Sequence, residues 1–214
     1  MTDSRDELVR AGARLTDLGL SPGSSGNLSI RVGSTMVMSP TGVSLGALDA
    51  ERLSVLDLAT GQLLDGPPPS KEFPLHRALY ARSGDAGAVV HLHSAYAAAW
   101  SCTHHHDKAS AVPPVTPYFV MKVGRTPLIG YAPPGDPRQA EALHALPGAF
   151  EAALLQNHGP IVAKASLAAA VDAAIELEEV CKLLILLGPH PVRHLTDDEA
   201  AHLAEKYRVP WGSP

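Results

Sequence analysis

The sequence of 214 residues has few aromatic side chains and only two cysteines. Phe, Trp and Tyr make up 5% of the chain, so its core must be built mainly from aliphatic side chains. Cys102 and Cys181 form neither a disulfide framework nor a CxxC pair, which is typical of a reducing compartment, and we expect a cytoplasmic protein. No apolar run approaches the ~18 residues that cross a bilayer, and the first ten residues alternate charges, so we expect neither a membrane span nor a signal peptide.

The chain also lacks an excess of positive charge. Its 17 Lys and Arg are outnumbered by 22 Asp and Glu, and the net charge of -5 argues against nucleic acid or an anionic membrane as a partner. An anionic ligand must therefore be held by local donors. With 45% hydrophobic and 18% charged residues the chain belongs to the globular class, and its length predicts one domain over residues 1–214.

Hydrophobic periodicity and turn residues predict a chain in which helices and hairpins alternate. The predicted helices cover residues 2–18, 71–83, 95–101 and 166–187, and Ser70 and Ser166 are their candidate N-caps. The predicted strands form hairpins at 28–39 and 54–66, a strand at 87–95 and a strand pair at 152–165. Residues 112–137 contain seven prolines, which predicts short strands and ordered loops. We therefore expect a single-domain α/β fold with α/β/α layers around a central, mainly antiparallel sheet.

Histidine is abundant, with eleven in the chain, and three of them have the pattern of a metal site. His91 and His93 lie two residues apart on a predicted strand, so both side chains leave the same face. His158 lies between two predicted strands in Asn-His-Gly, where Gly159 permits a tight turn and the imidazole can point into a cleft. Three neutral imidazoles with a fourth position left open are typical of catalytic Zn²⁺, although Mn²⁺, Co²⁺ and Fe²⁺ also accept imidazole.

Glu72 is the leading acid/base candidate, because it lies in the first turn of a predicted helix that follows a proline-rich loop. A glutamate there also stabilises the helix macrodipole, and from position alone this structural role is the simpler interpretation. Ser70, the positive charge of Lys71 and the N–H groups of the same helix start are suited to a phosphate. The small-residue loops 23–27 and 39–42 supply further hydroxyls and backbone amides.

Other polar residues have structural interpretations. His104, His105 and His106 form a run, but consecutive residues rarely point at one ion, so the run is predicted to be a solvated loop. We interpret His76 as a surface or packing residue and Glu178 as part of the solvated face of the helix 166–187.

The ordered combination of these segments resembles the class II aldolase/adducin family over nearly the whole chain. The segments that carry the resemblance are SSGNLSIR, SPTGVSLG, PSKEFPLHRALY, VVHLHS and LLQNHGPIVA. Within the family, PPVTPYFVMKVGR, YAPPGDP and Lys71 directly before Glu72 resemble the branch that decarboxylates 3-oxo-tetronate 4-phosphates. The histidine run at 104–106 is not part of the family pattern.

The resemblance implies a class II aldolase-like fold and one divalent metal per subunit. The metal would be held by His91, His93 and His158, with Glu72 beside it as acid/base and as a further ligand. The resemblance also implies a homo-oligomer, with a tetramer as the expected form and each site near a subunit interface.

The resemblance further implies a set of substrate contacts. The residues at the positions of the family's substrate and phosphate contacts are Asn27, Thr41, Gly42, Ser70 and Lys71. Tyr118 is a candidate additional proton donor, although its spacing does not place it.

The activity implied in this way is a carboxy-lyase reaction on a small phosphorylated sugar acid. A 3-oxo-tetronate 4-phosphate would lose CO2 through a metal-stabilised enediolate and give dihydroxyacetone phosphate. The first alternative is an aldolase or 4-epimerase that uses the same metal site on a deoxyketose 1-phosphate or a pentulose 5-phosphate. The second is a non-catalytic binding module like the adducin head, against which the three spaced histidines and Glu72 argue.

Overall fold

The computed structural model describes residues 2–104 and 107–212. Its helices are α1 (Thr2–Asp17), α2 (Phe73–Arg82), α3 (Ala95–Ser101), α4 (Pro117–Lys122), α5 (Pro137–Ala145), α6 (Leu167–Leu187) and α7 (Asp197–Tyr207), with short 3₁₀ turns at Leu45–Ala47 and Ala50–Arg52. Its strands are β1 (Asn27–Val32), β2 (Thr35–Met38), β3 (Ser54–Asp57), β4 (Leu63–Asp65), β5 (Ala88–His91), β6 (Leu128–Ile129), β7 (Ala152–Leu155) and β8 (Gly159–Lys164). No helix in the described ranges is long and apolar enough to cross a membrane.

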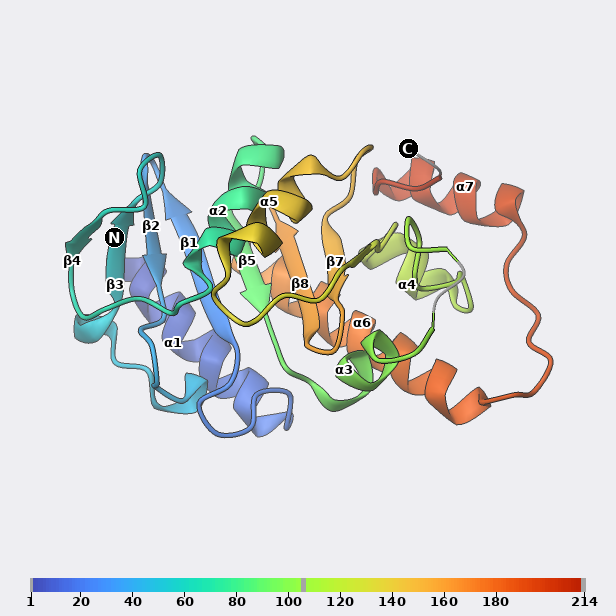
Figure 1. The fold of residues 1–214 in the computed structure, drawn as a ribbon, viewed down its shortest axis with the longest axis horizontal. Helices are drawn as coiled ribbons and strands as arrows, with labels where there is room; N and C mark the ends of the chain where they lie inside the picture. Colours follow the sequence, from blue (N-terminus) through green and yellow to red (C-terminus); the bar gives the residue numbers. More distant parts are fainter. Residues whose placement is uncertain (1, 105–106, 213–214) are drawn as a thin grey trace.

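The strands form one eight-stranded sheet in the order β4-β3-β2-β1-β5-β8-β7-β6 (Figure 1). All neighbouring pairs are antiparallel except β6 and β7, which are parallel. In the centre, Asn27 at the start of β1 is paired with His91 at the end of β5. The start of β8 follows the turn at His158, so the central strands bring the predicted site residues to one end of the sheet.

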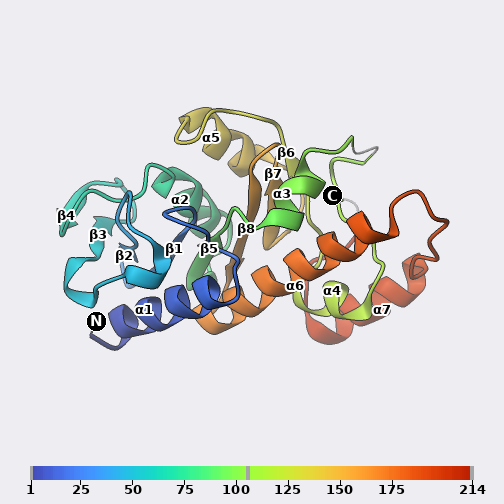
Figure 2. The same ribbon diagram turned by 90° about the horizontal axis from the view of Figure 1, so that it is seen from below.

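Helices cover both faces of the sheet (Figure 2). One core cluster packs α1, α3, α4, α6 and α7 against the sheet, and a second packs α2 and α5 on the opposite face. Adjacent residues of β5 alternate between the two clusters, since Val90 belongs to the first and Val89 to the second. This arrangement confirms the predicted α/β fold with a central, mainly antiparallel sheet between layers of helices.

The predicted elements agree with the structure in the N-terminal half and in α6, and they differ in residues 112–137. Short strands were expected in this segment. The structure contains one, the two-residue strand β6, but residues Pro117–Lys122 form the helix α4. The Thr116 hydroxyl accepts a hydrogen bond from the Phe119 N–H, and Pro117 occupies the first helical turn, where a missing N–H costs nothing. The local capping residues therefore outweigh the strand propensity of Tyr-Phe-Val.

Candidate active site

Three imidazoles converge at the end of the central strands. The Nε2 atoms of His91 and His93 lie 3.1 Å apart, those of His91 and His158 lie 3.3 Å apart, and those of His93 and His158 lie 2.9 Å apart. Nitrogen ligands about 2.0–2.1 Å from a tetrahedral metal lie roughly 3.3 Å from one another. The three nitrogens therefore have the spacing of a metal-binding triad.

The chain geometry explains why these imidazoles meet. β5 ends at His91, so His93 lies just beyond the strand and not on it as predicted, yet its ring still faces the same point. His158 lies between Asn157, whose φ is 57°, and Gly159, where an added Cβ would lie 2.3 Å from the Leu92 carbonyl oxygen. Only glycine permits this close approach of β8 to the segment between His91 and His93. The predicted tight turn is thus present and brings His158 to the other two histidines.

A backbone carbonyl selects the tautomer of the neutral His91 imidazole. His91 Nδ1 lies 2.8 Å from the Pro160 carbonyl oxygen, which only accepts, so Nδ1 carries the proton and Nε2 carries the lone pair. That lone pair faces the other Nε2 atoms and the Glu72 carboxylate. A cluster of lone pairs and a carboxylate with no cation of its own fits a divalent metal ion.

Glu72 completes the cluster from the start of α2, the helix that covers this face of the sheet. It occupies the N-cap position of α2, but its side chain caps nothing and turns toward the histidines. Oε2 lies 3.2 Å from His91 Nε2, and Oε1 lies 3.1 Å from His158 Nε2. Among the described residues, His91, His93, His158 and Glu72 are the group whose ligand atoms all lie within 4.8 Å of one another. This donor set can hold a divalent metal.

The electrostatics of the cluster favour the ligating forms. Burial raises the pKa of Glu72, but the proximity of the His91 and His158 imidazoles outweighs burial and holds the pKa of this carboxyl well below its usual range. Burial, followed by the proximity of His91 and His158, lowers the pKa of His93 to about 4. At neutral pH the site therefore contains a Glu72 carboxylate and a neutral His93 imidazole, which are the forms that bind metal.

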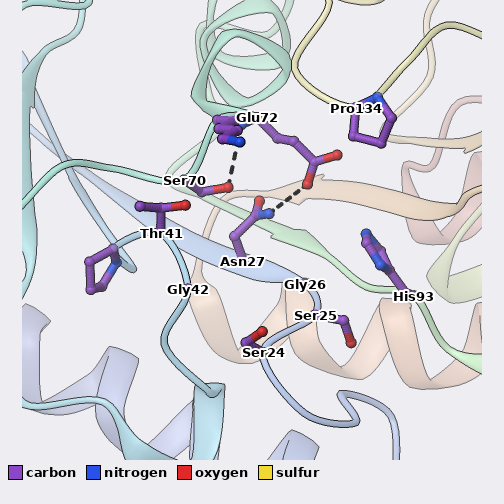
Figure 3. Close-up of a pocket in the computed structure, with 12 residues that line it drawn as sticks. Ser24, Ser25, Gly26, Asn27, Thr41, Gly42, Ser70, Glu72, His93 and Pro134 are labelled. Carbon is purple, nitrogen blue, oxygen red and sulfur yellow. Dashed lines mark hydrogen bonds between the residues drawn. The ribbon is translucent and has the colours of Figure 1, made fainter.

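A cavity of about 200 Å³ opens beside the cluster (Figure 3). It is lined by the five predicted substrate contacts, Asn27, Thr41, Gly42, Ser70 and Lys71, together with Glu72 and His93. The remaining lining residues are Ser24, Ser25, Gly26, Pro40 and Pro134. Lys71 is exposed and is the one lysine or arginine of this lining, so the cavity offers a single full positive charge among hydroxyls and backbone amides.

Two details at the cavity differ from the prediction. The Ser70 hydroxyl does not cap a helix starting at residue 71: it accepts the Glu72 N–H at 3.3 Å, and α2 begins at Phe73. The loop before α5 was not predicted to line the cavity, yet Pro134 does so, and an added Cβ on Gly135 would lie 3.2 Å from Lys71 Cβ. Only the three-dimensional fold brings this loop to Lys71.

Several predicted roles lie outside this cavity. Tyr118 is 59% exposed on α4, where its ring packs against the Lys122 ammonium, and it does not line the cavity. His104 belongs to none of the metal-binding groups found among the described residues, and His105 and His106 lie outside the described residues.

Sequence reasoning missed a buried set of polar residues behind Glu72. Asn27 Nδ2 donates to Glu72 Oε2 at 2.8 Å, and Asn27 Oδ1 lies 2.5 Å from His76 Nε2. His76 Nδ1 lies 2.7 Å from Ser29 Oγ, which lies 2.9 Å from the Tyr80 hydroxyl. His76 is fully buried and not a surface residue. The spacing of Glu72, His76 and Tyr80, four residues apart on one helical face, was the available signal.

Glu178 is also buried and does not belong to a solvated face. Its carboxylate accepts hydrogen bonds from Ser94 Oγ at 2.7 Å, from the Tyr96 N–H at 2.9 Å and from the Ala97 N–H at 2.8 Å. It therefore caps the start of α3, directly after His93. This carboxylate fixes the backbone that carries two of the three histidines.

Comparisons with known proteins show the family of the chain. The model of the family described as Class II Aldolase and Adducin N-terminal domain matches residues 6–185. The chain is 44% identical to the 3-oxo-tetronate 4-phosphate decarboxylase of Pectobacterium atrosepticum over 94% of this chain and 92% of that protein. It is 31% identical to the L-fuculose phosphate aldolase of an Escherichia coli strain over 95% of this chain and 93% of that protein.

A solved structure gives the same result for the fold. YgbL from Klebsiella pneumoniae superposes with a TM-score of 0.90 and 44% sequence identity, over 94% of this chain and 97% of that one. The likeness is therefore one of the whole fold.

Proposed function

Because the chain belongs to the class II aldolase and adducin N-terminal domain family, we propose that it is a metal-dependent decarboxylase that converts a 3-oxo-tetronate 4-phosphate to dihydroxyacetone phosphate and CO2. The observation that carries this proposal is the position of the Glu72 and histidine cluster beside a cavity with one lysine. A carboxy-lyase with a phosphorylated substrate needs both parts, one for the carbon–carbon bond and one for the phosphate.

His91, His93 and His158 would hold the metal, with Glu72 as a further ligand before substrate binds. Zn²⁺ is the metal we expect from three imidazoles, with Mn²⁺, Co²⁺ and Fe²⁺ as alternatives. A bound dication would draw electron density toward the substrate's oxygen atoms and so stabilise the negative charge left when CO2 departs.

The cavity residues bind and orient the substrate. Lys71 supplies a charge for the phosphate, and Ser70, Thr41, Asn27 and the backbone at Gly42 supply hydrogen bonds. A phosphate anchored beside Lys71 would place the carbon chain of the sugar acid toward Glu72 and His93, which line the same cavity. This anchoring orients the carbon–carbon bond that is broken.

Glu72 handles the proton. When the bond between C1 and C2 of the β-keto acid breaks, CO2 leaves, the electron pair stays on C2, and C2 then takes one proton to give the product. Glu72 Oε1 accepts no hydrogen bond within the described residues, so this oxygen is available to relay a proton from water to C2. Tyr118 stays a candidate donor, and because it is exposed in one chain, its role requires a neighbouring subunit to bring it to a site.

The experiment that tests this function is a product analysis. The purified, metal-loaded protein is incubated with both epimers of 3-oxo-tetronate 4-phosphate, and CO2 and dihydroxyacetone phosphate are measured. We expect both products in equal amounts. Cleavage of a sugar 1-phosphate without CO2 release from either epimer would overturn the proposal.

The second candidate is an aldolase or 4-epimerase on a sugar phosphate, and the 31% identity to L-fuculose phosphate aldolase favours it over other chemistries. Both reactions pass through the same charge at carbon, so the same cluster and cavity serve either. A non-catalytic module like the adducin head is the third alternative, and metal binding well below one ion per chain would support it.

We further propose a homotetramer with each site near a subunit boundary, which light scattering coupled to size exclusion would test. Cys102 and Cys181 are both free, which supports a reducing, cytoplasmic location. We expect neither nucleic acid nor membrane as a partner.

A further inference from the structure

A line of buried hydrogen bonds runs from Tyr80 to Glu72. Its members are at most 6% exposed: Tyr80, Ser29, His76, Asn27 and Glu72. Residues of β1 and α2 alternate along the line, which therefore crosses from the sheet to the helix and back. Its four contacts measure 2.9, 2.7, 2.5 and 2.8 Å in that order.

The chemistry of these groups decides which one donates and which one accepts in each hydrogen bond of the line. The Glu72 carboxylate only accepts, so the Asn27 amide nitrogen faces it and the amide oxygen faces His76. His76 Nε2 must then carry a hydrogen. Burial, followed by the proximity of His91, lowers the pKa of His76 to about 3, so the ring is neutral and Nδ1 accepts. Ser29 Oγ therefore donates to His76 and accepts from the Tyr80 hydroxyl.

The direction makes the two oxygens of Glu72 different. Oε2 is tied by Asn27, whereas Oε1 accepts no hydrogen bond from the described residues and faces His158. If the Asn27 amide turned over, its oxygen would face the carboxylate, and two acceptors would repel. A turned amide would also place its NH2 group against the Nε2 hydrogen of His76, so His76 adds to the preference that the carboxylate imposes.

We propose that His76, Ser29 and Tyr80 are positioning residues that orient the Asn27 amide and thereby hold Glu72 with Oε2 tied and Oε1 free for proton transfer. The inference rests on the proposed role of Glu72 in the reaction. It adds that the catalytic geometry depends on residues that never touch the substrate. Asn27 has a second amide hydrogen and lines the cavity, so the same amide also connects Glu72 to the substrate-binding space.

The test compares two substitutions of His76. His76→Gln keeps an N–H at the position of Nε2 and preserves the direction of the line, whereas His76→Leu removes the donor and leaves Asn27 Oδ1 unpaired. We expect His76→Leu to lower kcat at least about tenfold with KM changed less than about twofold, and His76→Gln to recover most of kcat. Metal content and melting temperature are measured for each variant.

Milder substitutions at Ser29 and Tyr80, the end of the line away from Glu72, keep the test informative if His76→Leu fails to fold. Ser29→Ala and Tyr80→Phe should lower kcat by about threefold and about twofold, because each removes a donor further from Glu72. The control is Ser54→Ala on β3, a buried serine whose hydroxyl donates to the Pro67 carbonyl instead. It should lower the melting temperature to a similar extent and leave kcat unchanged.

The outcomes separate this inference from the function itself. The product formed by the unmodified protein tests the function, and the ratio of variant to unmodified rate, on whichever substrate is turned over, tests the inference. Equal kcat values for His76→Gln and His76→Leu, or an unchanged kcat in the folded variants at Ser29, His76 and Tyr80, would show that the line serves stability alone and would overturn the proposal.

Discussion

The metal cluster and the cavity beside it are built in opposite ways. The cluster residues His91 and Glu72 are buried. His91 is held by a hydrogen bond to the Pro160 backbone carbonyl, and Glu72 is held by the amide of Asn27 on β1. The cavity is formed by small residues of several loops and by the exposed side chain of Lys71. The difference indicates that the four candidate metal ligands are in place before any ligand arrives, whereas the proposed phosphate contacts need the substrate itself to complete them.

The largest effect is expected from the cluster. His93→Ala removes one of three nitrogens and should abolish stoichiometric metal binding and lower kcat/KM by about 1,000-fold, while the chain stays folded because His93 lies beyond the end of β5. Metal analysis, circular dichroism and product formation measure this. His202→Ala, at an exposed position on α7, is the control. A variant that kept one metal per chain would contradict the ligand assignment.

Glu72→Gln should have the next largest effect. The amide keeps the size of the side chain but cannot carry a proton between water and substrate, so we expect kcat to fall about 100-fold while most of the metal remains. Metal content is measured beside kcat. Substantial loss of metal would show instead that Glu72 is an essential ligand. The exposed Glu205→Gln on α7 is the matched control.

Changes in the cavity should act on substrate binding and not on the metal. Lys71→Ala removes the one lysine of the lining, and we expect KM for the phosphorylated substrate to rise about tenfold with kcat within about twofold and metal content unchanged. Ser70→Ala should raise KM less. Lys182→Ala on α6 controls for the loss of charge, since the half-buried Lys182 pairs with Glu179 outside the cavity lining. An unchanged KM for both cavity variants would remove these residues from the phosphate site.

The smallest expected effect is that of His76 on the pH dependence of the unfolding free energy. The pKa of His76 is lowered to about 3 by burial, so the unfolded chain binds a proton between pH 6.5 and 3 that the folded chain does not. The unfolding free energy of the metal-free protein should therefore fall as pH falls through this window. His76→Gln should lose a slope of up to about 1.4 kcal/mol per pH unit. Urea unfolding at several pH values measures it, and equal slopes would contradict a neutral, buried His76.

The sequence was sufficient for the parts of the site that depend on local geometry. The two-residue spacing of His91 and His93 and the turn residues Asn157 and Gly159 predicted which imidazoles come together, even though β5 ends before His93. The directions of neighbouring side chains and the shape of a tight turn are both decided within a few residues. The mainly antiparallel sheet followed in the same way from two hairpins and a strand pair.

The rest depends on contacts between distant segments. The line through Ser29 and His76 exists only because β1 packs under α2, and no local pattern specifies that register. Glu178 lies on a helix that is apolar around most of its circumference, so its buried side was not evident from charge alone. In α4, the cap at Thr116 opposed the strand propensity of the residues after it, and propensity alone gave the wrong element.

Gly26, just before β1, and Gly159, at the start of β8, limit which parts of this protein can be substituted. Each lies where an added Cβ would come within 3 Å of a carbonyl oxygen in the segment 91–92, so the two residues fix the distances between the central strands. By contrast, added Cβ atoms on Gly23 and Gly42 would meet nothing within 4 Å, and only their φ values of 64° and 74° restrict substitution there. An engineer who wants a new substrate can therefore vary the loops 22–25 and 41–44 around these two glycines, while the strand junction is left untouched. We expect such changes to alter the proposed substrate contacts without moving the four candidate metal ligands.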